Sequence, residues 1–397
     1  MVSPSRTTTR TRLYVNYDGH VHESILPDPN DHFVKVVCEG SVAIGATAQG
    51  HIYKCSETKC PERIESCQEF KKDGTKIKFL LAGYYQFIVI KESNRVYAGG
   101  DHSYVGGVIG LEEGSGIYLR VVDTSMIKGH TITHATCGTY STVVVVDDTK
   151  VYLNGKLGKS TNRFELLQFN KPVSRISAGY DHMIIMCKDG TVYGMGTNGY
   201  SQIMDHREND SIVQLNPPFS HVLDCIAIRL SHITCWLTPT VVHVYGYFGD
   251  LYRQMLGFGA VRVDDHHVTI DREKLGHDFD ISGAYTSLTF FDKKQRKLIG
   301  GGGSSNLKQF SKLDLIDQLF ADALQKQSLY ENLDDTLLEV SNGADIVALL
   351  IGGDLEKVTS YTKQNLLKMC KRCIDDMPSG DDHSNGVVPF SDIVICI

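Results

Sequence analysis

The sequence predicts an all-β protein folded as a seven-bladed β-propeller, with the ring closed by its N- and C-terminal segments. Three observations lead to this fold. A β-rich unit recurs along the chain, successive units lie 41 to 60 residues apart, and the two chain ends carry complementary parts of one unit. A unit of this size buries its apolar face only against neighbouring copies, so the repeat determines the architecture.

Each unit begins with a short apolar strand that ends in a small residue and a glycine. Six copies end at Gly40, Gly83, Gly138, Gly179, Gly283 and Gly343, and a weaker copy has Arg229 in the glycine position. A second apolar strand follows at once. Glycine suits this position because the innermost strands crowd the central axis and the backbone turns sharply there.

A further strand of each unit usually has tyrosine second and glycine shortly after. The clearest copies are Val96–Gly100, Val151–Gly155, Val192–Gly196 and Val244–Gly246. Short β runs at this period, separated by glycine turns, are typical of propeller blades with four strands. Seven copies of the first strand predict seven blades.

The chain ends predict closure of the ring. Residues 13–16 read as an outer strand with no inner strand before it, and residues 340–343 begin a blade that has only a poor outer strand after it. Joining the two completes one blade and hides two sheet edges that would otherwise invite aggregation. We therefore assign residues 13–360 to the propeller.

Two segments depart from the blade pattern. Residues 311–326 and 362–376 place apolar side chains at helical spacing. The first is expected as a helical insertion in the propeller, and the second as part of a C-terminal helix and extension over residues 361–397. Both helices fit packing against the ring, and docking of a partner is the alternative.

Composition limits the functional classes. The net charge of −7 argues against a broad nucleic-acid surface, and no apolar run is long enough for a membrane span. Eleven cysteines without a framework spacing suit reduced thiols in the nucleus or cytoplasm. Residues 1–12 form an Arg/Ser/Thr-rich tail that is expected to be disordered. Its Arg6, Arg10 and Arg12 offer at most weak contact with nucleic acid or chromatin.

No residue set predicts a catalytic, cofactor or metal site. Residues 155–160 imitate a phosphate-binding loop but lack one glycine and a following helix. The spacing of His51, Cys55, Cys60 and Cys67 is loose for zinc, and Cys370 and Cys373 fall within a predicted helix. Residues 264–267 (Asp-Asp-His-His) suit a solvated loop better than a catalytic pair.

The unit resembles the repeat of the regulator of chromosome condensation family. The likeness spans roughly residues 13–360 and is strongest at 175–203, where Asn198 and Gln202 follow the third strand. Kelch-type and WD-type propellers are the rivals, and a single tryptophan, Trp236, speaks against both.

The family resemblance implies guanine-nucleotide exchange on a small GTPase of the Ran type. The founding member of the family opens the nucleotide site with a β-wedge, and residues 96–113 look like that segment. The closest part is Gly107, Val108, Ile109, Gly110 and Leu111. His232 matches a histidine of the family's GTPase-facing surface.

The chain also departs from the family pattern. The family's functional aspartates would fall at Tyr84 and Tyr140. A non-enzymatic propeller scaffold, or a subunit of a larger complex, therefore remains the alternative function. The wedge-like residues also fit a drifted copy of the family's ordinary Gly-Gln-Leu-Gly turn.

Overall fold

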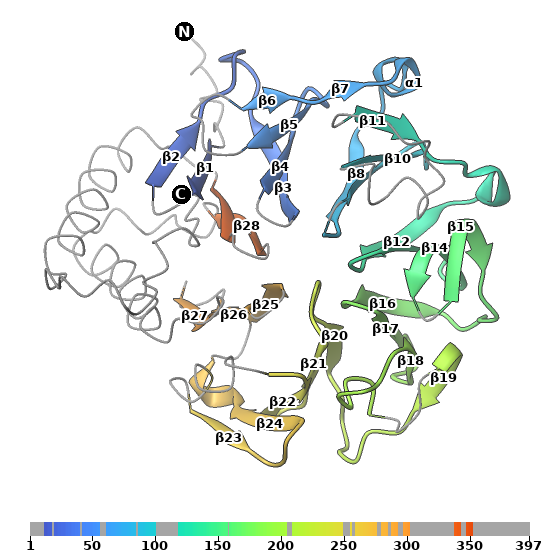
Figure 1. Ribbon diagram of the computed structural model, residues 1–397, viewed down its shortest axis with the longest axis vertical. Coiled ribbons are helices and arrows are strands. Elements are labelled where there is room, and N and C mark those ends of the chain that lie inside the picture. Colours follow the sequence, from blue (N-terminus) through green and yellow to red (C-terminus); the bar gives the residue numbers. More distant parts are fainter. Residues whose placement is uncertain are drawn as a thin grey trace, which may run out of the picture.

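The described strands of this computed structural model form seven sheets that stand around a central axis as a ring (Figure 1). The described residues are 12–17, 20–39, 42–55, 61–84, 86–100, 118–157, 159–204, 209–248, 255, 259–275, 279–284, 287–292, 297–301, 337–342 and 347–351. The seven sheets confirm the predicted propeller and its seven blades, which we number in the order of their innermost strands.

The first three blades follow one another along the chain. Blade 1 comprises β3 (Phe33–Glu39), β4 (Val42–Thr47), β5 (Ile52–Cys55) and β6 (Glu62–Arg63). Blade 2 comprises β8 (Ile77–Ala82), β9 (Gln86–Lys91), β10 (Val96–Gly100), β11 (Tyr118–Val121) and the short β7 (Glu65–Ser66), which pairs parallel to β11. Helix α1 (Gln68–Lys72) follows β7. After the 3₁₀ turn η1 (Ser125–Ile127), blade 3 comprises β12 (Ile132–Cys137), β13 (Ser141–Val146), β14 (Lys150–Leu157) and β15 (Lys159–Leu166).

The next three blades continue around the ring. Blade 4 comprises β16 (Val173–Ala178), β17 (His182–Cys187), β18 (Val192–Gly196) and β19 (Asn209–Leu215). Blade 5 comprises β20 (Asp224–Ala227), β21 (Ile233–Leu237), β22 (Val241–Gly246), β24 (His267–Asp271) and, at its edge, β23 (Ala260–Arg262). The 3₁₀ turn η2 (Arg272–Lys274) leads to blade 6, whose described strands are β25 (Phe279–Ala284), β26 (Ser287–Asp292) and β27 (Lys297–Gly301).

Blade 7 joins the two ends of the chain. Its inner strands β28 (Leu337–Asn342) and β29 (Val347–Ile351) come from the C-terminal part, and β1 (Arg12–Tyr17) and β2 (His20–Ser24) come from the N-terminal part. β1 pairs antiparallel with β29, with Leu13 opposite Leu350. The predicted closure is therefore confirmed. The predicted helices at 311–326 and 362–376, the outer strand near 356–358 and the tail up to residue 11 lie outside the described residues.

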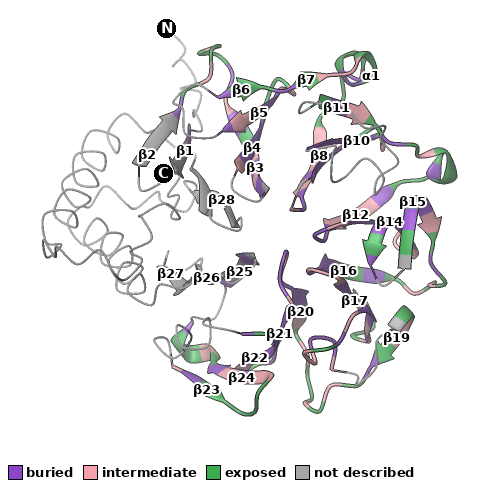
Figure 2. Cartoon of the chain, in the orientation of Figure 1, coloured by how far each residue is buried: buried purple, intermediate pink, exposed green. Residues whose placement is uncertain are grey.

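The core lies between the blades, not within any one of them (Figure 2). β13 is the clearest case because all six of its residues are buried. Val144 and Val146 pack in the cluster shared with blade 2, whereas Val143 and Val145 pack in the cluster shared with blade 4. Since successive side chains point to opposite sides of a strand, a strand between two neighbours needs apolar residues at every position.

The inner strands meet at a rim of tight turns. The backbone N–H of Thr139 donates to the Gly179 carbonyl at 3.2 Å, and the N–H of Tyr180 donates to the Ser231 carbonyl at 2.8 Å, so each turn is bonded to the next blade. A Cβ atom at Gly179 would lie 2.7 Å from that Ser231 oxygen. Glycine thus keeps neighbouring turns close enough to bond, as the repeat pattern predicted.

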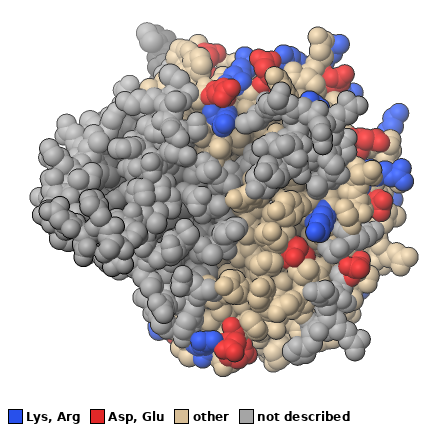
Figure 3. All heavy atoms as spheres, viewed as in Figure 1, with Lys and Arg blue, Asp and Glu red and all other residues tan. Residues whose placement is uncertain are grey.

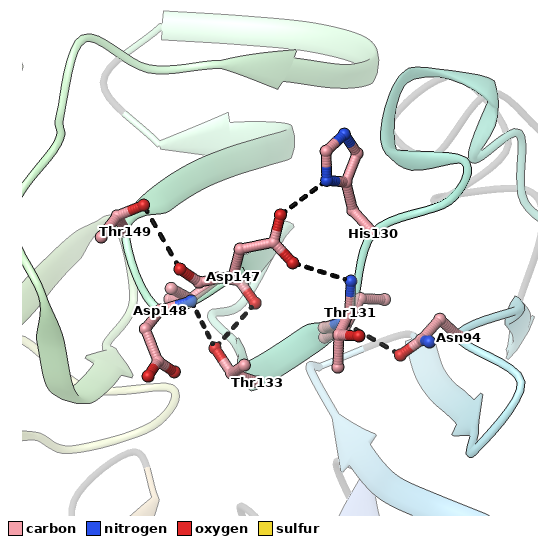
Figure 4. Close-up of polar contacts among 9 residues, drawn as sticks. Asn94, His130, Thr131, Thr133, Asp147, Asp148 and Thr149 are labelled. Carbon is pink, nitrogen blue, oxygen red and sulfur yellow. Dashed lines mark hydrogen bonds and ion pairs between the residues drawn. The ribbon is translucent and has the colours of Figure 1, made fainter.

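The ring has two faces. Face A carries the turns between the first and second strands of each blade, such as 179–182, and face B carries the turns between the second and third strands, such as 147–149. On face B, Asp147 contacts the His130 ring at 2.6 Å and accepts a hydrogen bond from the N–H of Thr131 at 3.0 Å (Figure 4). Asn94, from the corresponding turn of blade 2, accepts from the N–H of Ile132 at 3.0 Å. On this face Asn94 therefore connects blade 2 to blade 3, whereas Asp147 holds the link that enters its own blade.

Candidate functional site

His232 is the predicted site residue that the structure describes. It lies in the turn between β20 and β21, on face A, and its side chain is 27% exposed. Its Nδ1 atom lies 3.2 Å from Oδ1 of Asp181, which comes from the equivalent turn of blade 4. The two side chains join neighbouring blades at the rim and remain within reach of a partner.

Asp181 carries the negative charge of this pair. Burial alone would raise the pKa of Asp181, but contact with His232 and the hydrogen bond donated by Thr197 outweigh burial, so the pKa lies below its usual value. The carboxylate is therefore ionised at neutral pH. It gives face A a fixed negative charge that is oriented by two neighbours.

Aromatic rings surround this pair. The His232 ring lies 4.7 Å from the ring of Tyr180 and 5.3 Å from that of Tyr200. Tyr180 continues to Tyr140 of blade 3 at 5.9 Å, and Tyr200 continues to Tyr247 of blade 5 at 4.9 Å. We call the seven side chains that touch in this way the rim cluster: Tyr140, Tyr180, Asp181, Tyr200, His232, Tyr247 and His266.

The rim cluster has the character of a protein-binding surface. Tyrosine rings offer large contact area with little conformational freedom to lose, and they are enriched where proteins meet. Tyr247 is 52% exposed. In Figure 3, the described Lys, Arg, Asp and Glu residues lie mostly toward the outer edge of the face in view.

The wedge-like residues Gly107, Val108, Ile109, Gly110 and Leu111 lie outside the described residues. The point from which this segment leaves is described, however. Gly100, the last residue of β10, is paired with Gln86, the first residue of β9. The segment after Gly100 therefore leaves from face A, the face that carries His232.

The two tyrosines that replace the family's aspartates occupy different turn positions. Tyr140 directly precedes β13, as Asp181 directly precedes β17, so Tyr140 stands where blade 4 has a carboxylate. Tyr84 donates its backbone N–H to the Thr139 carbonyl at 3.3 Å and belongs to the bonded rim. Blade 4 thus keeps an aspartate at the position where blade 3 has tyrosine.

Sequence reasoning missed the role of Arg229, which was placed in the glycine position of the rim. Its Nη1 atom donates to the Ala82 carbonyl of blade 2 at 2.9 Å and also to the Cys38 carbonyl of blade 1. The side chain therefore reaches across the ring axis from blade 5. The sequence signalled this residue only by placing an arginine where the other copies of the repeat were aligned with a glycine.

The residues considered for other chemistry have structural surroundings. Residues 155–160 fall at the hairpin between β14 and β15, with Leu157 opposite Lys159. Strand β15 stands where a phosphate loop has a helix. Cys55 is buried, which raises the pKa of its thiol to about 12. His267 lies in β24 and stacks on Tyr245 at 4.1 Å. Among the described residues, no group of three or more His, Cys, Asp or Glu side chains is placed to hold a metal ion.

Comparison with known proteins agrees with this geometry. A family model described as the regulator of chromosome condensation (RCC1) repeat matches residues 173–202, which belong to blade 4. The crystal structure of human WBSCR16 is similar with a TM-score of 0.58 and 12% identity, over 87% of this chain and 99% of that one. Yeast RCC1 (Prp20), in a crystal structure with Kap60 bound, is similar with a TM-score of 0.50 and 15% identity, over 72% of this chain and 70% of that one.

At these identities the solved structures establish the fold alone, and the repeat match shows a likeness to the RCC1 repeat within blade 4. Among the described residues, no helix has the length and apolar character needed to cross a membrane. Blade 4 thus carries a match to the RCC1 repeat, and the closed ring of seven blades shares its propeller fold with WBSCR16 and yeast RCC1.

Proposed function

We propose that this protein regulates a small GTPase of the Ran type as a guanine-nucleotide exchange factor, acting through contacts of face A. The proposal rests on the finding that two of the proposed contact regions lie on the same face of the ring. His232 and the end of β10, from which the wedge-like segment departs, lie on the same side of the ring. The RCC1-type repeat in blade 4 supports the family to which this activity belongs.

The mechanism needs no covalent chemistry. An exchange factor binds the nucleotide-free GTPase more tightly than the loaded form, so by linkage it weakens nucleotide binding by the same factor. Residues 107–111 act as the wedge that competes with the bound nucleotide and its magnesium ion. His232, held by Asp181 at 3.2 Å, contacts the GTPase beside the wedge.

The test is release of a fluorescent guanine nucleotide from Ran and from a panel of other small GTPases. We expect micromolar full-length protein to accelerate release from one of them. Replacing residues 107–111 with Gly and Ser should abolish the acceleration. His232→Ala should reduce it about tenfold, because truncating one buried contact of a protein interface commonly costs on the order of 1.4 kcal/mol.

His130→Ala is the matched control. His130 is also an exposed histidine close to an aspartate, but it lies on face B (Figure 4). This variant should exchange nucleotide at the wild-type rate. Absence of acceleration with every GTPase, or full activity after replacement of residues 107–111, would reject the exchange function.

A scaffold function is the second candidate, and Tyr140 favours it. In blade 3 this tyrosine stands where blade 4 has Asp181, so the rim cluster is more aromatic and less acidic than an exchange surface with aspartates at both positions. A salt-resistant complex that contains no GTPase, and that Tyr140→Ala and Tyr200→Ala dissociate, would support this function.

Two finer expectations also remain proposals. The protein acts in the nucleus or cytoplasm, and Arg6 and Arg10 of the tail, with Arg12 at the start of β1, add weak, salt-sensitive contact with nucleic acid or chromatin. Deleting residues 1–11 should leave nucleotide release unchanged and reduce retention on DNA at low salt.

A further inference from the structure

A cavity of about 780 Å³ opens on face B between blades 1 and 2. Its walls come from the turn between β4 and β5, the link that runs from β6 through α1 to β8, and the last residue of β9. This is the opposite face from the rim cluster. The volume falls within the range of roughly 300 to 1,000 Å³ that is usual for small-molecule sites.

The floor of the cavity is apolar. Ile52, Ile64 and Phe70 are buried there, and each is at most 5% exposed. They belong to the cluster that joins blades 1 and 2, so the floor is part of the packed core and is held rigidly. The small parts of these side chains that remain exposed give the cavity a preformed apolar floor.

The charges around the opening are mainly positive. Lys35, Arg63 and Lys76 line the cavity, and within the described part of the chain none of them has a carboxylate at ion-pair distance. Lys71 also lines it and lies 3.5 Å from Glu65. This local excess of cations stands out in a chain whose net charge is −7.

The charged groups of the inner wall, Lys91 and Asp73, are already hydrogen-bonded within the protein. Lys91 is 3% exposed, and its Nζ donates to the Phe70 carbonyl at 3.1 Å and to the Asp73 carbonyl. The Asp73 carboxylate accepts from Thr75 and Ser93, each at 2.6 Å. The inner groups are therefore already used within the protein, and among the described residues Lys35, Arg63 and Lys76 at the opening have no carboxylate partner.

We propose that this cavity binds a phosphorylated small molecule, with its phosphates held by Lys35, Arg63 and Lys76 and its apolar part resting on Phe70 and Ile64. Arginine presents a planar fork of donors that matches phosphate oxygens, and lysine adds a mobile point charge. The site is independent of the GTPase contact because it lies on the other face and shares no residue with the rim cluster.

Isothermal titration calorimetry of the full-length protein tests this site. The probes are inorganic pyrophosphate, ATP without magnesium, adenosine, and a hexaglutamate peptide. We expect pyrophosphate and ATP to bind, ATP more tightly because its base adds apolar contact, and adenosine to give no heat. Binding should weaken as salt rises, since exposed charges are screened.

A pair of double variants makes the test specific. Arg63→Met with Lys76→Met removes two cations of the cavity, and both side chains are exposed, so folding should be retained. We expect affinity for both phosphate compounds to fall at least tenfold, since each charged hydrogen bond contributes on that order. Lys72→Met with Lys128→Met makes the same charge change at exposed lysines that do not line the cavity, and it should leave affinity unchanged.

Three results would overturn the proposal. One is the absence of heat with pyrophosphate and ATP at millimolar concentration. Another is an equal loss of affinity in the two double variants, which would indicate general attraction to a basic surface. The third is tighter binding of hexaglutamate than of either phosphate compound, which would make the cavity a docking site for an acidic protein segment.

Discussion

Blades 4 and 5 are neighbours with the same order of inner strands, yet they close the rim of the ring in different ways. In blade 4, the N–H of Gly179 donates to the His182 carbonyl at 2.8 Å across a tight turn. In blade 5, the N–H of Ile228 donates to the Ile233 carbonyl at 2.8 Å, across a turn that is two residues longer and contains Arg229. The glycine position of the repeat is therefore occupied by Ile228, and Arg229 follows it.

The difference shows that one rim can be closed by two kinds of contact. Blade 4 relies on close approach, because only glycine leaves room for the Ser231 carbonyl beside Gly179. Blade 5 relies on reach, because the Arg229 guanidinium donates to the carbonyls of Cys38 and Ala82 on the other side of the axis. The family model matches blade 4, where the glycine turn is kept.

The largest expected effect concerns the glycine that ends the third strand in both blades, Gly196 in blade 4 and Gly246 in blade 5. Gly246 has a φ of 135°, and a Cβ there would lie 1.8 Å from the His232 carbonyl oxygen. Gly196 has a φ of 110°, and a Cβ there would lie 2.2 Å from the backbone carbonyl oxygen of Asp181. Gly246→Ala and Gly196→Ala should each lower the free energy of unfolding by about 3 kcal/mol in urea titrations.

Gly50→Ala is the control for the strained φ alone. Gly50 has a φ of 81°, but a Cβ atom there would have no neighbour within 4 Å, so the loss should be about 1 kcal/mol. Equal losses at Gly50 and Gly246 would show that the neighbouring carbonyl is not what requires glycine.

The second effect is a pH dependence of folding stability. It arises in blade 4 from His182, the first residue of the second strand. His182 is fully buried, and burial lowers its pKa to about 4, whereas blade 5 has Ile233 at this position. In the unfolded chain this histidine has an ordinary pKa of about 6.5. Between about pH 4 and 6.5 it is therefore protonated in the unfolded chain and neutral in the folded one. The contribution of His182 to stability is therefore complete above pH 6.5 and is lost as the pH falls toward 4.

Urea titrations at pH 7 and pH 4.5 measure this contribution. The free energy of unfolding should fall by about 2 kcal/mol more in the wild type than in His182→Gln, which has no titrating ring. The amide can still bond to the Thr234 hydroxyl, which lies 2.9 Å from Nε2 in the wild type. A pH dependence that is identical in the two proteins would contradict the depressed pKa.

The third effect tests the reach of Arg229. Arg229→Met keeps most of the side-chain length but removes the donors to Ala82 and Cys38, and it should lower the free energy of unfolding by about 1.5 kcal/mol. Arg229→Lys should recover part of this loss, because an ammonium group can still donate to one carbonyl. If Met and Lys were equivalent, the carbonyl bonds would not matter for closure.

The smallest effect is expected on face B. Lys188 of blade 4 lies 2.8 Å from Asp148 of blade 3, and its hydrogen bond lowers the pKa of that carboxyl. Both side chains are well exposed, so water and salt screen the pair. Lys188→Met should leave the melting temperature unchanged within error at neutral pH, and a clear decrease would show that face B contributes to closure as much as the rim does.

Much of the fold could be predicted because propeller blades repeat a local pattern. The glycines of the rim, the tyrosine strands and the unmatched strand at residues 13–16 carried enough information for seven blades and a closed ring. Arg229 could not be interpreted in this way, because the repeat assigns a residue only to its own blade. Its partners Cys38 of blade 1 and Ala82 of blade 2 lie 191 and 147 residues away along the chain.

The residues of the candidate site were also predictable only in part. His232 was found through its resemblance to a family position, but Asp181, Tyr200 and Tyr247 were not assigned to any site. They come from turns of blades 4 and 5 that look like ordinary turn sequence, and only the stacking of blades places their side chains beside His232. The cavity on face B likewise depends on the contact between two blades.

The sequence by itself determined the period, the number of blades and the joining of the two ends. Strand alternation and glycine turns are local properties, and they are written in every copy. The tertiary structure alone decided which side chains meet across the rim and between blades. Those contacts depend on the angle between rigid sheets around the axis, and no single repeat encodes that angle.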